Sequence, residues 1–154
     1  MQQFQRPALV IAVCLGTFMA SLDISIVNVA LDTMQSSLNT NMAGLQWVVD
    51  AYALCLSALI LSSGPLGDRY GRKRIWMAGI ALFTIGSAVC ALSGSLPVLL
   101  TGRVIQGIAG AAVIPGALTL LAHAFPEQKA RLKVIGIWSS VSAVSLALGP
   151  LLGG

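Results

Sequence analysis

The chain has 154 residues, of which 56% are hydrophobic and 9% charged, whereas soluble domains carry about 25% charged residues. The net charge is +4, but the basic residues stand at the ends of apolar runs, which argues against nucleic acid as a partner. The spacing of the three cysteines matches no zinc or redox motif, so no metal and no cofactor are expected. The composition predicts a protein whose surroundings are a lipid bilayer.

Five apolar runs are long enough to cross the hydrocarbon core, which takes roughly 17–25 helical residues. The first, 7–30, is too long for the core of a signal peptide, which has about 7–15 residues. The polar stretch 31–44 is expected to be a connection. The remaining predicted helices are 45–63, 75–93, 96–123 and 134–154. The sequence therefore predicts an all-α membrane protein with five transmembrane helices.

A polar interruption lies between the second and third predicted helices and carries five charged residues. Gly64 and Pro65 are expected to end the helix before it, because Pro lacks a backbone N–H and Gly lowers helix stability. Gly67 and Gly71 then allow the backbone to turn tightly. The interruption is predicted to be a loop.

This loop is mainly basic. Arg72, Lys73 and Arg74 precede the third predicted helix, where the helix dipole disfavours each positive charge by about 0.3–1 kcal/mol. Attraction to an anionic inner leaflet is worth about 1 kcal/mol per basic residue, so a cytoplasmic membrane surface accounts for them better. Asp68 is four residues before Arg72, and a helical turn would bring the two opposite charges together.

The orientation follows from the Lys and Arg residues outside the predicted spans, which all fall on one side of the membrane. They are Arg6, Arg69, Arg72, Lys73, Arg74, Lys129, Arg131 and Lys133. Because cytoplasmic segments collect basic residues, the N-terminus is expected inside and Gly154 near the outer face.

Three charged residues lie within the predicted spans: Asp23, Asp50 and Arg103. At about 1.5 Å of rise per residue, all three lie roughly 8–11 Å below the outer boundary and can share one layer. Charges at this depth are costly unless they face one another or a wet cavity. In one interpretation Arg103 pairs with one aspartate and holds the helices together. In the other, the surplus carboxylate takes up and releases protons or attracts a cation.

Uncharged polar residues add to these spans. Asn28, Gln46 and Gln106 either contact a solute or bond across helices, and bonding is favoured for Asn28 and Gln46. In the last predicted helix, Gly149 and Gly153 have the spacing of closely packed membrane helices.

Several motifs resemble those of the major facilitator superfamily, in particular its 14-helix drug:proton antiporter branch. The stretch 64–74 resembles motif A at every specified position except Gly67, where Ala is usual. On the fourth predicted helix the residues that resemble motif B are Leu99, Arg103, Gln106 and Gly107, with Ala109 and Gly110 in exchanged order.

The fifth predicted helix resembles motif C, which is associated with antiporters. The matching residues are Gly149, Pro150, Gly153 and Gly154, whereas Ser145 replaces the first glycine. The stretch 22–31 resembles the first-helix motif of the 14-helix branch, with Ser25 for Thr and Asp32 for Pro. The stretch 46–52 also resembles that branch.

The resemblance covers essentially the whole chain but only part of the family's length. It implies that 1–154 is an N-terminal fragment, most of the first six-helix half of a transporter in a bacterial inner membrane. It also implies that Asp23 and Arg103 line a central cavity. The loop residues that it implies hold the two halves together are Gly64, Gly67, Asp68, Arg69, Gly71, Arg72, Lys73 and Arg74.

The activity that the resemblance implies is proton-coupled efflux of amphipathic or cationic drugs, which is transport and not enzymatic chemistry. The partners would be protons, the solute and the missing C-terminal half. The residues named for proton coupling or the cavity are Asp23, Asp50, Arg103, Asn28 and Gln106. Two alternatives stay open: a non-transporting fragment that only packs against other helices, and a transporter of another small solute.

Overall fold

The computed structural model describes residues 2–38 and 40–153. The predicted place of Gly154 in the fifth-helix motif therefore lies outside the described residues. The described chain forms five helices: α1 (Gln2–Ser37), α2 (Met42–Tyr70), α3 (Arg72–Ala91), α4 (Leu96–Ala124) and α5 (Gln128–Gly153). Each contains a stretch long and apolar enough to cross a membrane. The predicted all-α fold with five transmembrane helices is confirmed.

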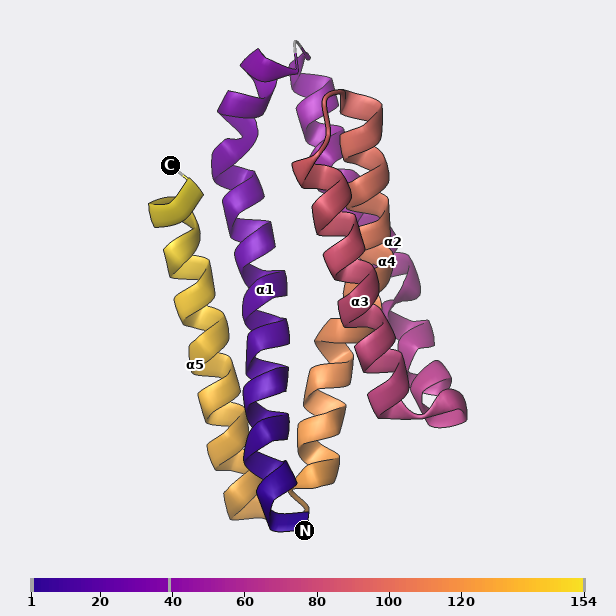
Figure 1. The fold of residues 1–154 in the computed structure, drawn as a ribbon, viewed down its shortest axis with the longest axis vertical. Coiled ribbons are helices and arrows are strands. Elements are labelled where there is room, and N and C mark those ends of the chain that lie inside the picture. Colours follow the sequence, from indigo (N-terminus) through magenta and orange to yellow (C-terminus); the bar gives the residue numbers. More distant parts are fainter. Residues whose placement is uncertain (1, 39, 154) are drawn as a thin grey trace.

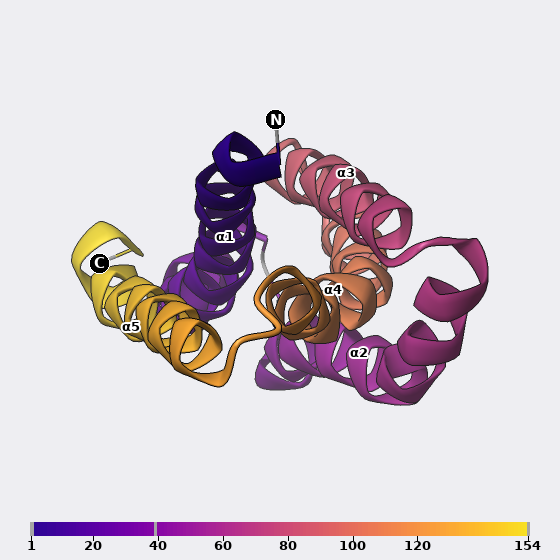
Figure 2. The same ribbon diagram turned by 90° about the horizontal axis from the view of Figure 1, so that it is seen from below.

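The helices form two groups around the central α4 (Figures 1 and 2). The first group is α4 with α2 and α3 packed along it, and the second is α5 packed along α1. The two groups meet mainly where α1 contacts α4.

Glycines allow α3 and α4 to approach closely. A Cβ atom on Gly86 would lie 2.7 Å from Cγ of Gln106, and one on Gly102 would lie 2.5 Å from Sγ of Cys90. Small residues of this kind are the usual means of helix contact in lipid, where no hydrophobic force drives helices together. The close contact of α3 with α4 brings polar residues of both helices within bonding distance.

The predicted end of the second helix at Gly64 and Pro65 is wrong. The helix continues through both residues to Tyr70. A proline has a helical φ angle, and helices that cross a membrane tolerate it because neighbouring helices and side chains satisfy the freed backbone groups. The break comes at Gly71, whose φ of 97° is unfavourable for other residues. Gly67 is helical, and its carbonyl accepts a hydrogen bond from the N–H of Gly71 at 2.9 Å.

The predicted connections on both sides of the bundle are shorter in the structure. Within 31–44, α1 continues to Ser37 and α2 already begins at Met42. The last helix begins at Gln128, six residues before the predicted start. Polar residues extend helices beyond the apolar stretch because a helix satisfies its own backbone groups in water as well as in lipid.

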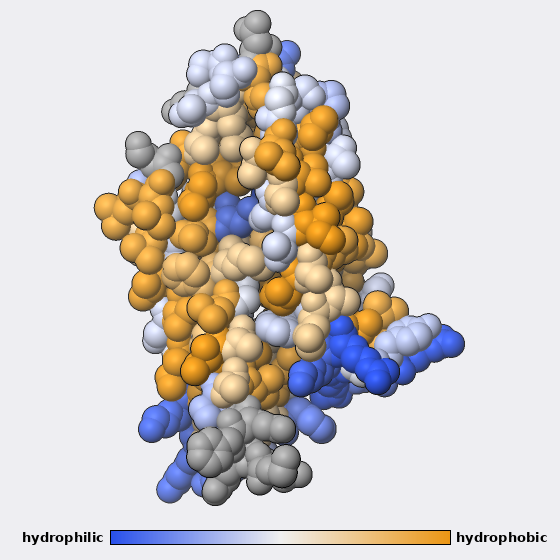
Figure 3. All heavy atoms as spheres, viewed as in Figure 1, coloured by the Kyte–Doolittle hydropathy of each residue, from blue (hydrophilic) through white to orange (hydrophobic). Residues whose placement is uncertain are grey.

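The face of the molecule seen in Figure 3 has an apolar band between two polar ends. Hydrophilic residues gather at the lower end, over the turn between α2 and α3 and the start of α5. This is the basic end, defined by Arg69, Arg72, Lys73, Arg74, Lys129, Arg131 and Lys133. Within the apolar band a small hydrophilic spot is visible between α1 and α3.

Candidate functional site

The charged residues of α1 and α4 form an ion pair inside the bundle. Arg103 of α4 is 2% exposed, and its Nη1 donates to Oδ2 of Asp23 of α1 at 2.6 Å. The side chain of Asp23 remains 17% exposed. The carboxylate can therefore be reached from outside the bundle, whereas the guanidinium cannot.

The second helix also holds Arg103. The arginine Nε donates to the carbonyl oxygen of Val48 at 3.1 Å. Its Cζ lies 4.5 Å from the ring centre of Tyr52, one turn further along α2. A guanidinium over an aromatic face is attracted by the negative charge of the ring face. Arg103 thus joins α1, α2 and α4 at one point.

Glycines of α4 make room for Tyr52. A Cβ atom on Gly107 would lie 2.6 Å from the carbonyl oxygen of Tyr52, and one on Gly110 would lie 3.1 Å from its hydroxyl oxygen. Tyr52 is 5% exposed, and its hydroxyl has no hydrogen-bond partner among the described residues. The position of the Tyr52 side chain is therefore fixed by close packing against α4 and by the contact of its ring with Arg103.

Gln106 completes the cluster and is fully buried. Its Nε2 donates to Oδ1 of Asp23 at 2.7 Å and to Oγ of Ser87 at 2.9 Å. Its Oε1 accepts from Nη1 of Arg103 at 2.9 Å and from Sγ of Cys90 at 3.4 Å. Four helices, α1 to α4, therefore contribute to one polar cluster, defined by Asp23, Val48, Tyr52, Ser87, Cys90, Arg103 and Gln106.

The other residues named from the sequence lie outside this cluster. Asp50 is exposed, and no hydrogen bond or ion pair joins it to another described residue. Gln46 is also exposed. The interhelical bonding favoured for Asn28 is wrong, because its amide donates to the carbonyl of Ile24 in the same helix at 2.9 Å. Gln106 makes the interhelical bonds instead.

Sequence reasoning missed Tyr52, Ser87 and Cys90. Ser87 and Cys90 are three residues apart and lie on one face of α3. The same face carries Gly79 and Gly86, seven residues apart, which approach α4 closely. This glycine spacing was the available signal for the face of α3 that turns toward α4.

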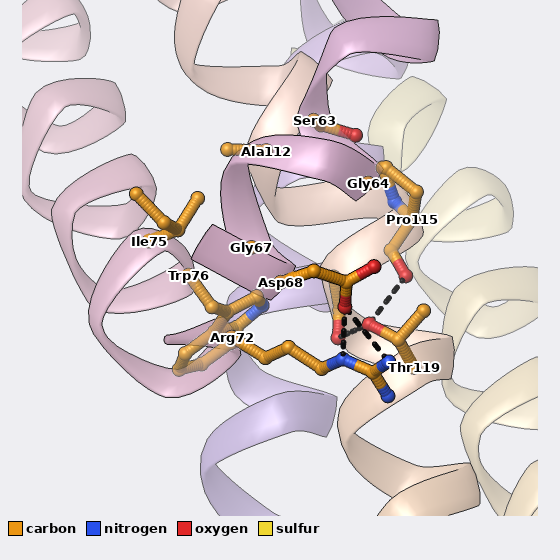
Figure 4. A pocket seen from close by; sticks show the side chains of 11 residues that line it. Ser63, Gly64, Gly67, Asp68, Arg72, Ile75, Trp76, Ala112, Pro115 and Thr119 are labelled. Atoms are coloured by element: carbon orange, nitrogen blue, oxygen red, sulfur yellow. Dashed lines mark hydrogen bonds and ion pairs between the residues drawn. The ribbon is translucent and has the colours of Figure 1, made fainter. Parts of the chain in front are cut away.

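The turn between α2 and α3 carries a second ion pair, at the basic end (Figure 4). Nε and Nη2 of Arg72 both donate to Oδ1 of Asp68, at 3.0 and 2.8 Å. The expected proximity of these two charges is confirmed, although they stand on different helices on either side of Gly71. The side chains are 43% and 64% exposed, and such surface pairs contribute only about 0–1 kcal/mol.

A pocket of about 100 Å³ opens beside this pair. Its lining comes from α2, α3 and α4 and includes Gly64, Gly67, Trp76, Pro115 and Thr119 (Figure 4). The remaining basic residues of the motif, Arg69, Lys73 and Arg74, are exposed outside it. The motif thus forms the rim of a small hollow between three helices.

The fifth-helix motif packs against α1. A Cβ atom on Gly149 would collide with the hydroxyl of Ser25, whose Oγ donates to the carbonyl of Leu146 at 2.8 Å. Nearer the basic end, Nε1 of Trp138 donates to Oγ1 of Thr17 at 2.8 Å. Pro150 lies inside α5, which continues to Gly153. Gly149 therefore allows close contact of α5 with α1.

Comparison with known proteins gives a family match over most of the chain. Residues 13–154 match the model of the Major Facilitator Superfamily. The chain is 40% identical over 147 residues to the methylenomycin A resistance protein of Bacillus subtilis, which covers 96% of this chain and 32% of that protein. It is 46% identical over 144 residues to the multidrug resistance protein Stp of Mycobacterium tuberculosis, covering 94% of this chain and 27% of Stp.

A relative whose name gives another solute is also similar to this chain. The chain is 37% identical over 150 residues to the riboflavin transporter RibZ of Clostridioides difficile, covering 97% of this chain. The chain spans 33% of RibZ, so in all three comparisons it matches a third of the relative or less. With its five membrane-crossing helices and this family match, the chain is a multi-pass membrane protein that belongs to the Major Facilitator Superfamily.

Proposed function

We propose that this chain is the N-terminal part of a proton-coupled exporter of amphipathic or cationic compounds in a bacterial inner membrane, with its basic end in the cytoplasm. The observation that carries the proposal is the ion pair of Asp23 with the buried Arg103, 2.6 Å apart within helices that cross the membrane. Ionisable residues in such helices most often mark ion or solute pathways. The names of two of the similar proteins, which refer to drug resistance, support an exported drug as the solute.

In this proposal Asp23 is the group that takes up and releases the proton. Its carboxylate is partly exposed, so a proton or a cationic solute can reach it, while Arg103 stays buried beneath it. Protonation cancels the charge that attracts Arg103, and the arginine keeps its contacts with Val48 and Tyr52 of α2. Neutralising one carboxylate would thereby weaken the contact between α1 and α4 without exposing a charge to lipid.

Asp50 is the surplus carboxylate. It is exposed and unpaired among the described residues, and a lone carboxylate in hydrocarbon is costly. We propose that it faces water or the remainder of the transporter and attracts the cationic solute. The motif around Asp68 and Arg72 would contact the C-terminal half of the transporter at the cytoplasmic side.

A transporter of another small solute is the second candidate, favoured by the similarity to a riboflavin transporter. A non-transporting fragment that packs against other helices is the third. The identity of the transported solute distinguishes a drug exporter from a transporter of another small solute. A non-transporting fragment differs from both because it moves no solute across the membrane.

The experiment joins residues 1–154 to the remaining part of the B. subtilis methylenomycin A resistance protein and reconstitutes the chimera in proteoliposomes. An imposed proton gradient should drive transport of a cationic dye, and the chain alone should transport none. Asp23→Asn should abolish this flux while leaving membrane insertion unchanged. Asp50→Asn, the matched carboxylate outside the cluster, should reduce dye affinity more than the response to the gradient. Full gradient-driven flux with Asp23→Asn would refute the assignment of the proton to Asp23.

A further inference from the structure

The polar cluster contains a group that can change its hydrogen bonds when Asp23 changes charge. We propose that the side-chain amide of Gln106 is a switch: it rotates by half a turn when Asp23 takes up a proton, and this rotation separates Arg103 from α1. The proposal rests on the assignment of the proton to Asp23 made above. It goes beyond that assignment because it names how the proton acts on the arginine.

Gln106 has no unused hydrogen-bonding capacity. A glutamine amide offers two N–H donors and two acceptor sites on its oxygen. The donors bind Asp23 and Ser87, and the oxygen accepts from Arg103 and Cys90. Because Gln106 is fully buried, any lost bond leaves an unsatisfied polar group, which costs about 1–3 kcal/mol.

Two of these partners, Asp23 and Arg103, determine which way the Gln106 amide points. A guanidinium can only donate, and an ionised carboxylate can only accept. The oxygen of Gln106 must therefore face Arg103, and its nitrogen must face Asp23. The hydroxyl of Ser87 and the thiol of Cys90 can each donate or accept, so they tolerate either orientation.

A proton on Asp23 changes the hydrogen bonds that its carboxyl group can make. Oδ1 faces the N–H of Gln106 and Oδ2 faces the N–H of Arg103. A proton on Oδ1 therefore faces a donor, the N–H of Gln106. Gln106 removes this conflict by rotating its amide so that Oε1 accepts from the new O–H.

The rotation then acts on Arg103. After the rotation, the N–H groups of Gln106 face the N–H groups of the guanidinium. Arg103 then loses its hydrogen bond to Oε1 of Gln106 and its attraction to the Asp23 carboxylate. Ser87 can donate to the rotated oxygen and Cys90 can accept from the rotated nitrogen, although a sulfur is a weak acceptor. Arg103 is the one partner that cannot adapt, so it moves toward the carbonyl of Val48 and the ring of Tyr52 on α2.

The titratable groups that face Asp23 come from three helices. They are Arg103 of α4, which pairs with it, and Tyr52 of α2 and Cys90 of α3, which interact with its charge. Tyrosine and cysteine are ordinarily neutral at pH 7, so the charge that Asp23 meets is that of Arg103. In the described part of α5 the charged residues are Lys129, Arg131 and Lys133, in its first two turns at the basic end.

The test is solid-state NMR of the 154-residue chain in lipid bilayers, with 15N in glutamine side chains and 13C in aspartate carboxyls. The carboxyl signal of Asp23 reports its protonation, and the dipolar contact between its Cγ and Nε2 of Gln106 reports the amide orientation. Gln106→Met assigns the amide signal by its loss, and backbone assignment through 103–106 provides the same information if that variant does not insert. Glu127→Gln, which removes an exposed carboxylate at the basic end, is the matched control and should change neither signal.

We expect the Cγ to Nε2 contact at high pH and its loss in the same pH range in which Asp23 protonates. A protonated Asp23 that keeps the contact would overturn the switch and leave the proton assignment standing. A carboxyl signal of Asp23 that stays ionised over the whole pH range in which the chain remains folded would overturn both, because the switch would then have no trigger.

Discussion

Arg103 is held by groups from α1 and α2 as well as by its own helix, so the energetic effect of removing it differs from the effect of removing its contacts one by one. A buried arginine has lost its hydration, and attraction to a carboxylate offsets that cost only where further hydrogen bonds satisfy both groups. Removing one partner leaves the other charged within the bundle and without its counter-ion. Removing both side chains leaves no unpaired charge, so the pair is suited to a double-mutant cycle.

Arg103→Leu should destabilise the chain by about 3–5 kcal/mol, because it leaves the Asp23 carboxylate unpaired. Asp23→Asn combined with Arg103→Leu should be less destabilised than the single arginine variant. The measurement is loss of helicity on titration with a denaturing detergent in mixed micelles. Additive effects of the two changes would contradict the ion pair.

Tyr52 offers a finer test at the same scale. Because its hydroxyl has no partner among the described residues, Tyr52→Phe should change stability little or raise it slightly. Tyr52→Leu removes the ring under Arg103 and should lose about 0.5–2 kcal/mol beyond the lost packing, the range of a cation–π contact. The same detergent titration measures both. A larger loss for Phe than for Leu would show that the hydroxyl, not the ring, stabilises the cluster.

At the scale of the helix, the turn between α2 and α3 depends on one backbone angle. Gly71→Ala places a side chain at a φ of 97° and should cost about 1–3 kcal/mol, the range for a strained backbone position. Gly64→Ala is the matched control, because Gly64 is helical and a Cβ there meets nothing within 4 Å. It should stabilise α2 by about 0.5–1 kcal/mol. If the two substitutions changed the stability equally, the assignment of the helix break to Gly71 would be wrong.

The same turn shows how far sequence reasoning reaches. The five spans follow from apolar length alone, because each must cross the same hydrocarbon thickness. The ends of the helices do not follow from apolar length. Pro65 predicts a helix end by the rules for soluble proteins, but α2 continues through it. The polar residues after 30 read as a loop, although α1 continues to Ser37.

The pairing of Asp23 with Arg103 could be anticipated because two opposite charges at one depth in lipid have few other partners. The contacts of Gln106 with Ser87 and Cys90 could not, because they depend on how α3 is rotated against α4. That rotation is set by which glycines face each other, here Gly86 and Gly102. A single sequence shows where the glycines are, but it does not show which glycine of α3 faces which glycine of α4.

For the whole molecule, the polar cluster lies where the two groups of helices meet. One group contains α1 and α5, joined by the Ser25 and Trp138 hydrogen bonds. The other contains α2, α3 and α4. Toward the basic end, the two groups share an apolar contact in which Trp76 packs with Val13 and Leu121. A change in the polar cluster can therefore alter the contact of α1 with α4 while this apolar contact remains.

The orientation of this assembly sets the direction in which a proton gradient acts, and it can be tested directly. In a background where the three native cysteines are replaced by alanine, Ser36→Cys and Lys73→Cys place single thiols on exposed positions at opposite ends of the bundle. Because basic residues collect on the cytoplasmic side, a membrane-impermeant maleimide added to intact cells should label Ser36→Cys and leave Lys73→Cys unlabelled until the membrane is opened. The reverse pattern would place the basic end outside, and Asp23 would then lie near the cytoplasmic face, where export would require it to release its proton.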